Sequence, residues 1–196
     1  MPTFDSGRPG PQRQGLRQNP SAKMVDLERA LAAVSPKVRF AALEAHEALK
    51  ERGVPHMLVG GLAVGAHGYP YATQDVDFVV GDEAFEFSGR GHVSFARGIP
   101  IQIDGVQVDY LSPDKVAHLD RLVESTRGTE DLCVVPIEQL MYMKLLAGRQ
   151  KDQAAIVGLF QTGTDTEAIR TFIAEVAPAL LPRLDRLIEQ ARREEG

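Results

Sequence analysis

The hydrophobic positions of the chain change their period twice, from helical to alternating and back to helical. In the segment "SPKVRFAALEAHEALKERG" apolar residues recur every three or four positions, which predicts a helix. Ser35 is a suitable N-cap, Pro36 suits the first turn and Gly53 favours a stop. Thr164 and Glu167 form a capping-box pattern ahead of the next-to-last helix. Further helices are predicted over residues 25–33, 62–70, 113–124, 137–147, 150–160, 166–177 and 182–194.

The middle of the chain carries short runs of apolar and β-branched residues, which predict strands. Gly105 marks a turn between two of these runs, and residues 81–91 read as a loop. The resulting fold class is α+β (mixed α/β), with a small mixed β-sheet flanked by helices and a C-terminal helical region. The predicted strands are "HMLVGG" (56–61), "QDVDFVV" (74–80), "HVSFA" (92–96), "IPIQI" (99–103), "VQVDYL" (106–111) and "CVVP" (133–136).

Three regions are expected along the chain of 196 residues. Residues 1–23 are rich in Gly, Pro, Gln and Arg and have little to bury, which predicts a disordered tail. Residues 24–160 hold the sheet and its helices and are expected to form the main domain. Residues 161–196 are expected to be C-terminal helices packed on it.

Composition narrows the range of functions. The net charge of −5 gives no support to a protein that coats duplex nucleic acid. The single cysteine excludes a disulfide framework and a cysteine-based zinc site. The sequence has no apolar run long enough to cross a membrane and no signal-peptide pattern, so no membrane partner and a cytoplasmic location are expected.

Two carboxylates interrupt one of the predicted strands. Side chains at positions i and i+2 of a strand point to the same face, so Asp75 and Asp77 are expected to project together. Close carboxylates raise each other's pKa unless a cation lies between them, and Mg²⁺ prefers such oxygen ligands. The alternative interpretation is a solvated sheet edge whose charges prevent pairing with other strands.

Three further positions extend this pattern. Gly60 and Gly61 lie where a strand passes into a helix, where backbone N–H groups can approach an anion; the alternative is a tight turn. Asp109 interrupts the predicted strand 106–111 and supplies a third carboxylate for a two-metal site. Asp104 also lies nearby, but its "DG" context indicates a turn.

Cationic residues gather in the segment "EQLMYMKLLAGRQKDQAAI". Lys144 stands on an apolar helix and is expected to need a partner, whereas Arg149, Lys151 and Asp152 follow near the helix end. Such cations can hold a triphosphate, although each one alone is also typical of a helix surface. Weaker candidates are His67 and Tyr71, which lie between the glycines and the aspartate pair. Cys133 is expected to be a buried core residue.

The segments "VGGLAVGAHGYPYATQDVDFVV", "VQVDYL" and "VPIEQLMYMKLLAGRQKD" together resemble the polymerase-beta-like nucleotidyltransferase superfamily. Within it the chain looks most like the small abortive-infection, AbiEii-type nucleotidyltransferases. The resemblance covers about residues 40–160 and depends on the order of the motifs along the chain. It implies a nucleotidyltransferase fold that moves a nucleoside monophosphate from an NTP to an acceptor.

The resemblance also implies roles for individual residues. Asp75, Asp77 and Asp109 would be catalytic and would hold two Mg²⁺ or Mn²⁺ ions. The nucleotide-binding residues would be Gly60, Gly61, Lys144, Arg149, Lys151 and Asp152. The acceptor, which the sequence leaves open, would be RNA, a protein or a small molecule, and the chain would be the toxin partner of an antitoxin.

Two positions depart from the family pattern. Leu62 follows the glycines where a serine is frequent, and Tyr71 stands where many relatives carry a basic residue. Both changes remove a contact to phosphate. The alternative function is therefore a catalytically impaired nucleotide- or partner-binding module on the same fold, and a third interpretation is a structural protein with chance acids.

Overall fold

The computed structural model describes residues 25–85 and 100–194, so the predicted tail (1–23) and the predicted strand 92–96 lie outside the described residues. Except for those predicted over 62–70 and 113–124, the helices agree closely with their predicted ranges. The α-helices are α1 (Leu27–Ala33), α2 (Pro36–Glu51), α3 (Gly60–Ala66), α4 (Leu119–Glu124), α5 (Ile137–Ala147), α6 (Gln150–Gln161), α7 (Thr166–Val176) and α8 (Leu181–Glu194). The strands are β1 (His56–Val59), β2 (Asp75–Val80), β3 (Ile101–Ile103) and β4 (Val106–Leu111).

The four strands form one mixed sheet in the order β1-β2-β4-β3. Strand β1 runs antiparallel to β2, β3 runs antiparallel to β4, and the central pair β2 and β4 is parallel. Asp104 and Gly105 both have positive φ, as the turn between β3 and β4 requires. The predicted mixed α/β class, with a small sheet flanked by helices, is confirmed.

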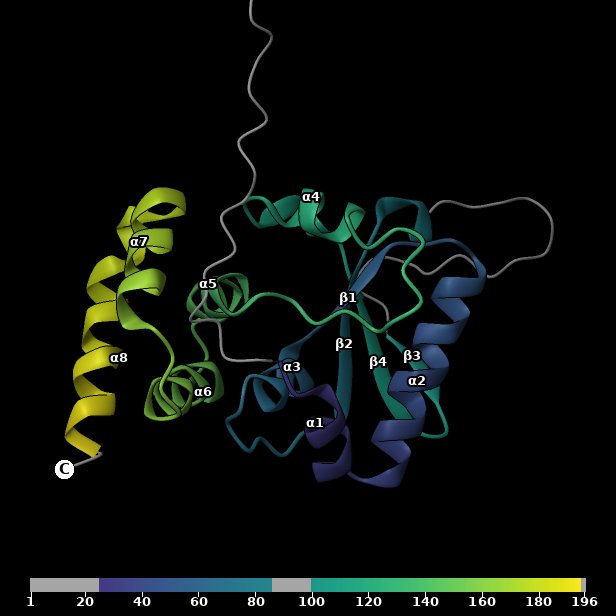
Figure 1. The fold of residues 1–196 in the computed structure, drawn as a ribbon, viewed down its shortest axis with the longest axis horizontal. Coiled ribbons are helices and arrows are strands. Elements are labelled where there is room, and N and C mark those ends of the chain that lie inside the picture. The colour runs from purple at the N-terminus through teal and green to yellow at the C-terminus, as the bar shows by residue number, and fades with distance from the viewer. Residues whose placement is uncertain (1–24, 86–99, 195–196) are drawn as a thin grey trace, which may run out of the picture.

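The two faces of the sheet belong to two hydrophobic clusters. Val76, Phe78 and Val80 point to the cluster that packs under α2, whereas Val79 on the opposite face belongs to the cluster formed with the C-terminal helices. Figure 1 shows α2 on one side of the sheet and α5 and α6 on the other. Strand β2 is therefore buried from both sides over part of its length, whereas β4 is buried on the α2 face and leaves Gln107 and Leu111 exposed on the other.

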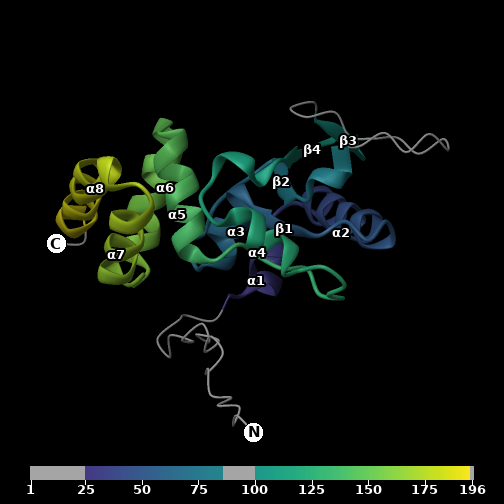
Figure 2. The same cartoon turned by 90° about the horizontal axis from the view of Figure 1, so that it is seen from above.

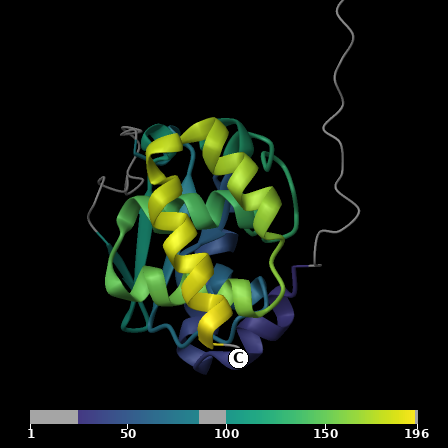
Figure 3. The same ribbon diagram turned by 90° about the vertical axis from the view of Figure 1, so that its left-hand side faces the viewer.

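The C-terminal helices form a second layer beyond α5 and α6. Viewed from above and from the side, α7 and α8 lie outside α5 and α6, away from the sheet (Figures 2 and 3). Their buried residues Ile173, Leu184 and Leu187 belong to the same cluster as Leu145 of α5 and Ile156 of α6. The domain limits read from the sequence remain predictions. No helix in the described ranges is long and apolar enough to span a membrane.

Three local predictions are wrong. The helix expected over 113–124 is split into a 3-10 turn (Pro113–Lys115) and α4, because His118 adopts a left-handed φ of 63°. The expected strand "CVVP" contributes only an isolated bridge between Val134 and Leu58. The N-cap of α7 is Asp165, which accepts from the first-turn N–H groups, whereas Thr164 donates to Leu159 instead.

Two smaller differences concern the glycines and the cysteine. Helix α3 spans Gly60–Ala66, so it begins two residues and ends four residues before the predicted range 62–70. Cys133 is half-buried rather than buried, because it lies at the edge of the cluster against which it packs.

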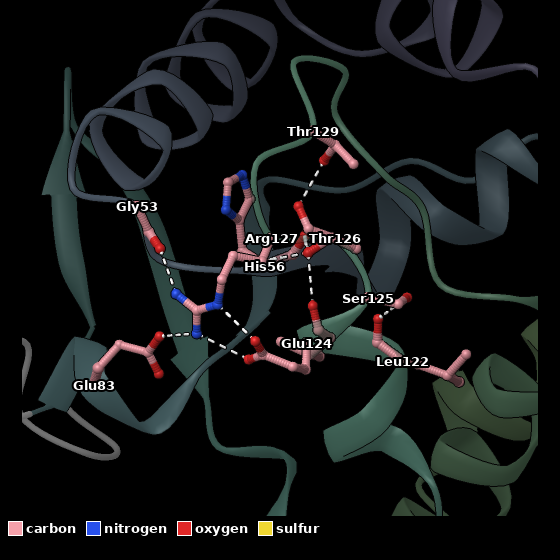
Figure 4. Close-up of polar contacts among 10 residues, drawn as sticks. Gly53, His56, Glu83, Leu122, Glu124, Ser125, Thr126, Arg127 and Thr129 are labelled. Carbon is pink, nitrogen blue, oxygen red and sulfur yellow. Dashed lines mark hydrogen bonds and ion pairs between the residues drawn. The ribbon is translucent and has the colours of Figure 1, made fainter.

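Side-chain hydrogen bonds after α4 attach this helix to the sheet (Figure 4). The buried hydroxyl of Thr126 accepts from the backbone N–H of His56 at 3.0 Å. Arg127 donates to the carbonyl of Gly53 at 2.9 Å and forms ion pairs with Glu83 and Glu124. This contact set holds the chain that follows β2 close to the start of β1.

Candidate functional site

The three predicted carboxylates lie on one face of the sheet. Asp75 and Asp77 alternate with the buried Val76 along β2, and Asp77 is the direct partner of Asp109 in the parallel register. Cross-strand partners point to the same side, so Asp109 joins the pair rather than facing away from it. All three side chains are partly exposed.

Two of these carboxylates are held by neighbours that the sequence did not single out. The hydroxyl of Thr73 donates to Asp75, and the side-chain amide of Gln107 donates to Asp109 at 2.8 Å. Within residues 25–85 and 100–194, no three His, Cys, Asp or Glu side chains are close enough together to hold a metal ion. The aspartates therefore share a face without converging on one point.

Asp77 differs from the other two because it forms no hydrogen bond or ion pair within the described residues. Burial, then the charges of Asp75 and Asp109, raise its pKa to about 6, while Lys144 and Lys151 oppose this effect. Burial is the largest cause of this shift and the neighbouring carboxylates add to it, so a cation bound beside Asp77 would lower its pKa.

Gly60 is required by close packing against this carboxylate. Its φ is +65°, and a Cβ at this position would lie 1.8 Å from Oδ2 of Asp77. At Gly61 a Cβ would lie 2.7 Å from the side chain of Thr73 and 3.1 Å from the ring of Tyr71. Both glycines therefore allow the start of α3 to approach the aspartate pair. The tight turn and the close backbone approach, given above as alternatives, occur here together.

The cationic side of the site is a compact cluster. Nζ of Lys144 lies 3.2 Å from Oδ1 of Asp152, and Nε of Arg149 lies 2.7 Å from Oδ2. The side chain of Asp152 is only 2% exposed and that of Lys144 8%, whereas that of Arg149 is 63% exposed. The partner that Lys144 was expected to need is thus Asp152, eight residues further along the chain.

Protonation states follow from this packing. Burial acts to raise the pKa of Asp152, but the hydrogen bonds and charges of Arg149 and Lys144 outweigh it and lower the pKa. Burial lowers the pKa of Lys144, and the charges of Asp152 and Asp77 oppose that shift. Asp77 and Lys144 therefore influence each other electrostatically across the site.

The remaining candidates fall into different environments. The ring of Tyr71 lies 5.7 Å from Nζ of Lys144, in a cation–π contact. Lys151 is exposed but close enough to affect Asp77. His67 is buried and its ring N–H donates to the carbonyl of Val135 at 2.8 Å, which is a structural role. Leu62 points into the cluster under α2, away from the aspartates.

A cleft of about 160 Å³ joins the two sides of the site. Its volume is below the 300 Å³ or so of a typical small-molecule pocket, so part of a nucleotide would lie outside it. Gly61, Asp75, Asp109 and Lys151 do not line it. The lining residues are Val59, Gly60, Asp77, Leu111, Leu140, Met143, Lys144, Ala147, Arg149 and Asp152.

The donor set fits a hard divalent cation. Carboxylate oxygens are the ligands that Mg²⁺ prefers, and three carboxylates stand on adjacent strands, of which Asp77 has its pKa raised by burial and by the other two. Rotation of the Asp75 and Asp109 side chains away from Thr73 and Gln107 would be needed to use all three.

Comparisons with known proteins give little further information. No family model matches the sequence, and no curated protein matches it significantly. One similar solved structure is the crystal structure of an antigenic nucleotidyltransferase-like protein from Paracoccidioides brasiliensis, with 12% identity and a TM-score of 0.42. The alignment covers 77% of this chain and 93% of that chain. So distant a likeness assigns neither a family nor an activity.

Proposed function

We propose that the chain is a Mg²⁺- or Mn²⁺-dependent nucleotidyltransferase of the AbiEii type. One observation carries the proposal: a cleft with Asp77, an unneutralised carboxylate flanked by Asp75 and Asp109, on one side and Lys144 and Arg149 on the other. A nucleoside triphosphate bound with divalent metal needs both kinds of charge, because its metals require anionic ligands and its free phosphate oxygens require cations.

The proposed reaction is an in-line displacement. The acceptor oxygen forms a bond to the α-phosphorus, the bond from that phosphorus to the bridging oxygen breaks, and pyrophosphate leaves with its electron pair. The acceptor proton passes to Asp109 or to water beside it. Bound divalent metal would supply charge stabilisation for the attacking and leaving oxygens. Asp75, Asp77 and Asp109 would hold that metal.

The other residues would bind and orient the triphosphate. Gly60 and Gly61 bring the backbone at the start of α3 next to the aspartates. Lys144 and Arg149 present cationic groups at the opposite side of the cleft, and Asp152 fixes both of them. Lys151 adds an exposed positive charge. Most of the catalysis would then come from positioning and from preorganised charge.

The acceptor and the biological setting belong to the same proposal. RNA, a protein hydroxyl and a small molecule are all compatible with attack on the α-phosphorus. An antitoxin partner would make the chain the toxin of a toxin–antitoxin pair.

The test begins with binding. ATP, GTP, CTP and UTP are titrated calorimetrically into the full chain with and without Mg²⁺, and each α-labelled NTP is then incubated with cell extract. We expect metal-dependent binding of at least one NTP and transfer of label to a macromolecule or a small molecule. Asp77→Asn and Asp75→Asn are expected to abolish transfer.

Asp120→Asn is a matched control, because Asp120 is an exposed aspartate on α4 and does not line the cleft. It is expected to bind and transfer like the wild type. Unchanged NTP binding and label transfer in both Asp75→Asn and Asp77→Asn would contradict the proposed metal site.

A second candidate is a nucleotide- or partner-binding module that does not turn over. It is favoured by Leu62, whose side chain lies in the core and offers no hydroxyl, and by Tyr71, which occupies the side of Lys144 with an aromatic ring. Metal-dependent NTP binding without label on any acceptor would support this module over the enzyme.

A further inference from the structure

The turn between α5 and α6 sets the distance between the cationic groups of the site. Lys144 lies in the last turn of α5, whereas Arg149 and Asp152 belong to the start of α6. Gly148 connects the helices with a φ of 64°, and its N–H donates to the carbonyl of Lys144 at 2.9 Å. This left-handed C-cap decides how α6 leaves α5.

Arg183 of the C-terminal helix α8 holds this turn from outside. Its Nη1 donates to the carbonyl of Leu145 at 2.8 Å, one of the carbonyls that the end of α5 leaves without a helical partner. A Cβ on Gly148 would lie 2.6 Å from the same Nη1. The guanidinium therefore occupies the space that only glycine leaves open, at the negative end of the α5 dipole.

Among the described residues Arg183 forms no ion pair, so no carboxylate draws its guanidinium away from the turn. Its helix is fixed firmly, because Leu184, Leu187 and Ile188 are buried in the cluster shared with α5 and α6. Arg170 of α7 also pairs with Asp185 beside it. The guanidinium is thus presented to the turn by a rigid element.

We infer that Arg183 is a positioning residue for the phosphate-binding side of the site, acting through the turn that sets Arg149 and Asp152 against Lys144. Its meaning for nucleotide binding rests on the function proposed above. Helix α8, more than thirty residues beyond Lys144 in sequence, therefore helps to position the site. Loss of the Arg183 contact would let the turn shift and would misplace Asp152 relative to Lys144, whose ammonium lies 3.2 Å from its carboxylate.

The first test compares three variants of the full chain. Arg183→Met keeps an unbranched side chain without donors, Arg183→Lys restores one cationic donor, and Arg186→Met is the matched control. Arg186 is an exposed arginine on the same helix, and among the described residues it forms no hydrogen bond with the turn. Each variant is titrated with MgATP, MgGTP, MgCTP and MgUTP, and its melting temperature is recorded.

We expect Arg183→Met to weaken binding of the preferred Mg–NTP about tenfold, as supporting contacts outside a binding site typically do. Arg183→Lys is expected to recover part of this loss, and Arg186→Met to bind like the wild type. Wild-type affinity in Arg183→Met would overturn the inference. So would equal losses in Arg183→Lys and Arg183→Met that follow their melting temperatures, because that pattern indicates general destabilisation.

A second measurement does not depend on nucleotide. The ammonium of Lys144 donates to the buried carboxylate of Asp152 across the turn, so its NMR signal should exchange slowly with water in the wild type and in Arg186→Met. We expect fast exchange in Arg183→Met. Slow exchange in that variant would overturn the positioning role. If no wild-type NTP binding is found but the Lys144 signal responds as expected, the proposed function fails and the positioning role stands.

Discussion

The two sides of the cleft differ in whether their carboxylates are paired with cations. On the α5–α6 side, Asp152 is 2% exposed and is matched by Lys144 and Arg149. On the sheet side, Asp75, Asp77 and Asp109 share one face, and none of them forms an ion pair within the described part of the chain. The α5–α6 side pairs one buried carboxylate with two cations, whereas the sheet side carries negative charge without a paired cation.

This difference indicates which side is built for stability and which for a ligand. A buried ion pair with its hydrogen bonds formed holds two helices in place, and breaking it leaves an uncompensated charge. A row of carboxylates without cations costs stability, which a fold tolerates where a cation or reactant is to be bound.

The largest effect is expected for Asp152→Asn, which keeps the shape of the side chain but removes its charge. The ammonium of Lys144, whose side chain is 8% exposed, would lose its anionic partner. We expect a loss of about 3 kcal/mol in the free energy of unfolding, measured by urea denaturation.

The control for this variant is Lys37→Ala, which breaks the pair between Lys37 and Asp104, whose side chains are 66% and 56% exposed. Its expected cost is below about 1 kcal/mol. Equal losses in the two variants would show that the cluster is no more structural than a surface pair.

The next effect is the pH dependence caused by Asp77. Its pKa is raised from 3.8 to about 6, so the folded chain binds this proton more tightly than the unfolded chain. Stability contributed by this group is therefore present below about pH 4 and is lost as the pH rises towards 6, by up to about 3 kcal/mol.

Asp77→Asn should abolish that loss and be more stable than the wild type above pH 6. The measurement is the free energy of unfolding between pH 4 and 8 without divalent metal, with Asp120→Asn following the wild-type curve. If the difference in unfolding free energy between the wild type and Asp77→Asn does not change with pH, the negative charge on the sheet side is already neutralised.

A third pair of variants separates backbone strain from close approach. Gly60 and Gly128 both have positive φ, at 65° and 75°, but a Cβ at Gly128 would meet nothing within 4 Å. Gly60→Ala should therefore cost about 2 kcal/mol more than Gly128→Ala in thermal or urea unfolding, because its methyl group collides with Asp77. Equal costs would show that the start of α3 can move away from the carboxylate.

The smallest effect concerns the ring above Lys144. Tyr71→Leu removes the cation–π contact and should cost about 1 kcal/mol, whereas Tyr71→Phe keeps the ring and should cost less than half of that. Urea denaturation of both variants gives the comparison. A larger cost for Tyr71→Phe than for Tyr71→Leu would assign the stabilising contact to the hydroxyl instead.

Much of the secondary structure could be predicted because its signals are local. Ser35 caps α2 as its sequence indicates, and the last four helices lie within a residue or so of their predicted ranges. The failures occurred where distant contacts outweigh local preference. His118 adopts a left-handed conformation inside a segment with helical composition, and Val134 makes one bridge to β1 instead of forming a strand.

For the site, the sequence predicted positions but not contacts. The two-residue period of a strand placed Asp75 and Asp77 on one face, and the apolar surroundings of Lys144 indicated that it needs a partner. Thr73 and Gln107 carry no sequence signal that separates them from ordinary polar residues, although each lies two positions from an aspartate that it contacts. Arg183 is distant in sequence and could not be found at all.

The sequence by itself determined the periodicity of the elements, their caps and the shared face of the aspartate pair, because these depend on residues a few positions apart. Only the tertiary structure decided that Asp109 stands beside Asp77, that Asp152 neutralises Lys144 and that α8 reaches the turn after α5. Those relations depend on strand register and on the packing of helices far apart in the chain. Both are fixed by the burial of the whole core and not by any local pattern.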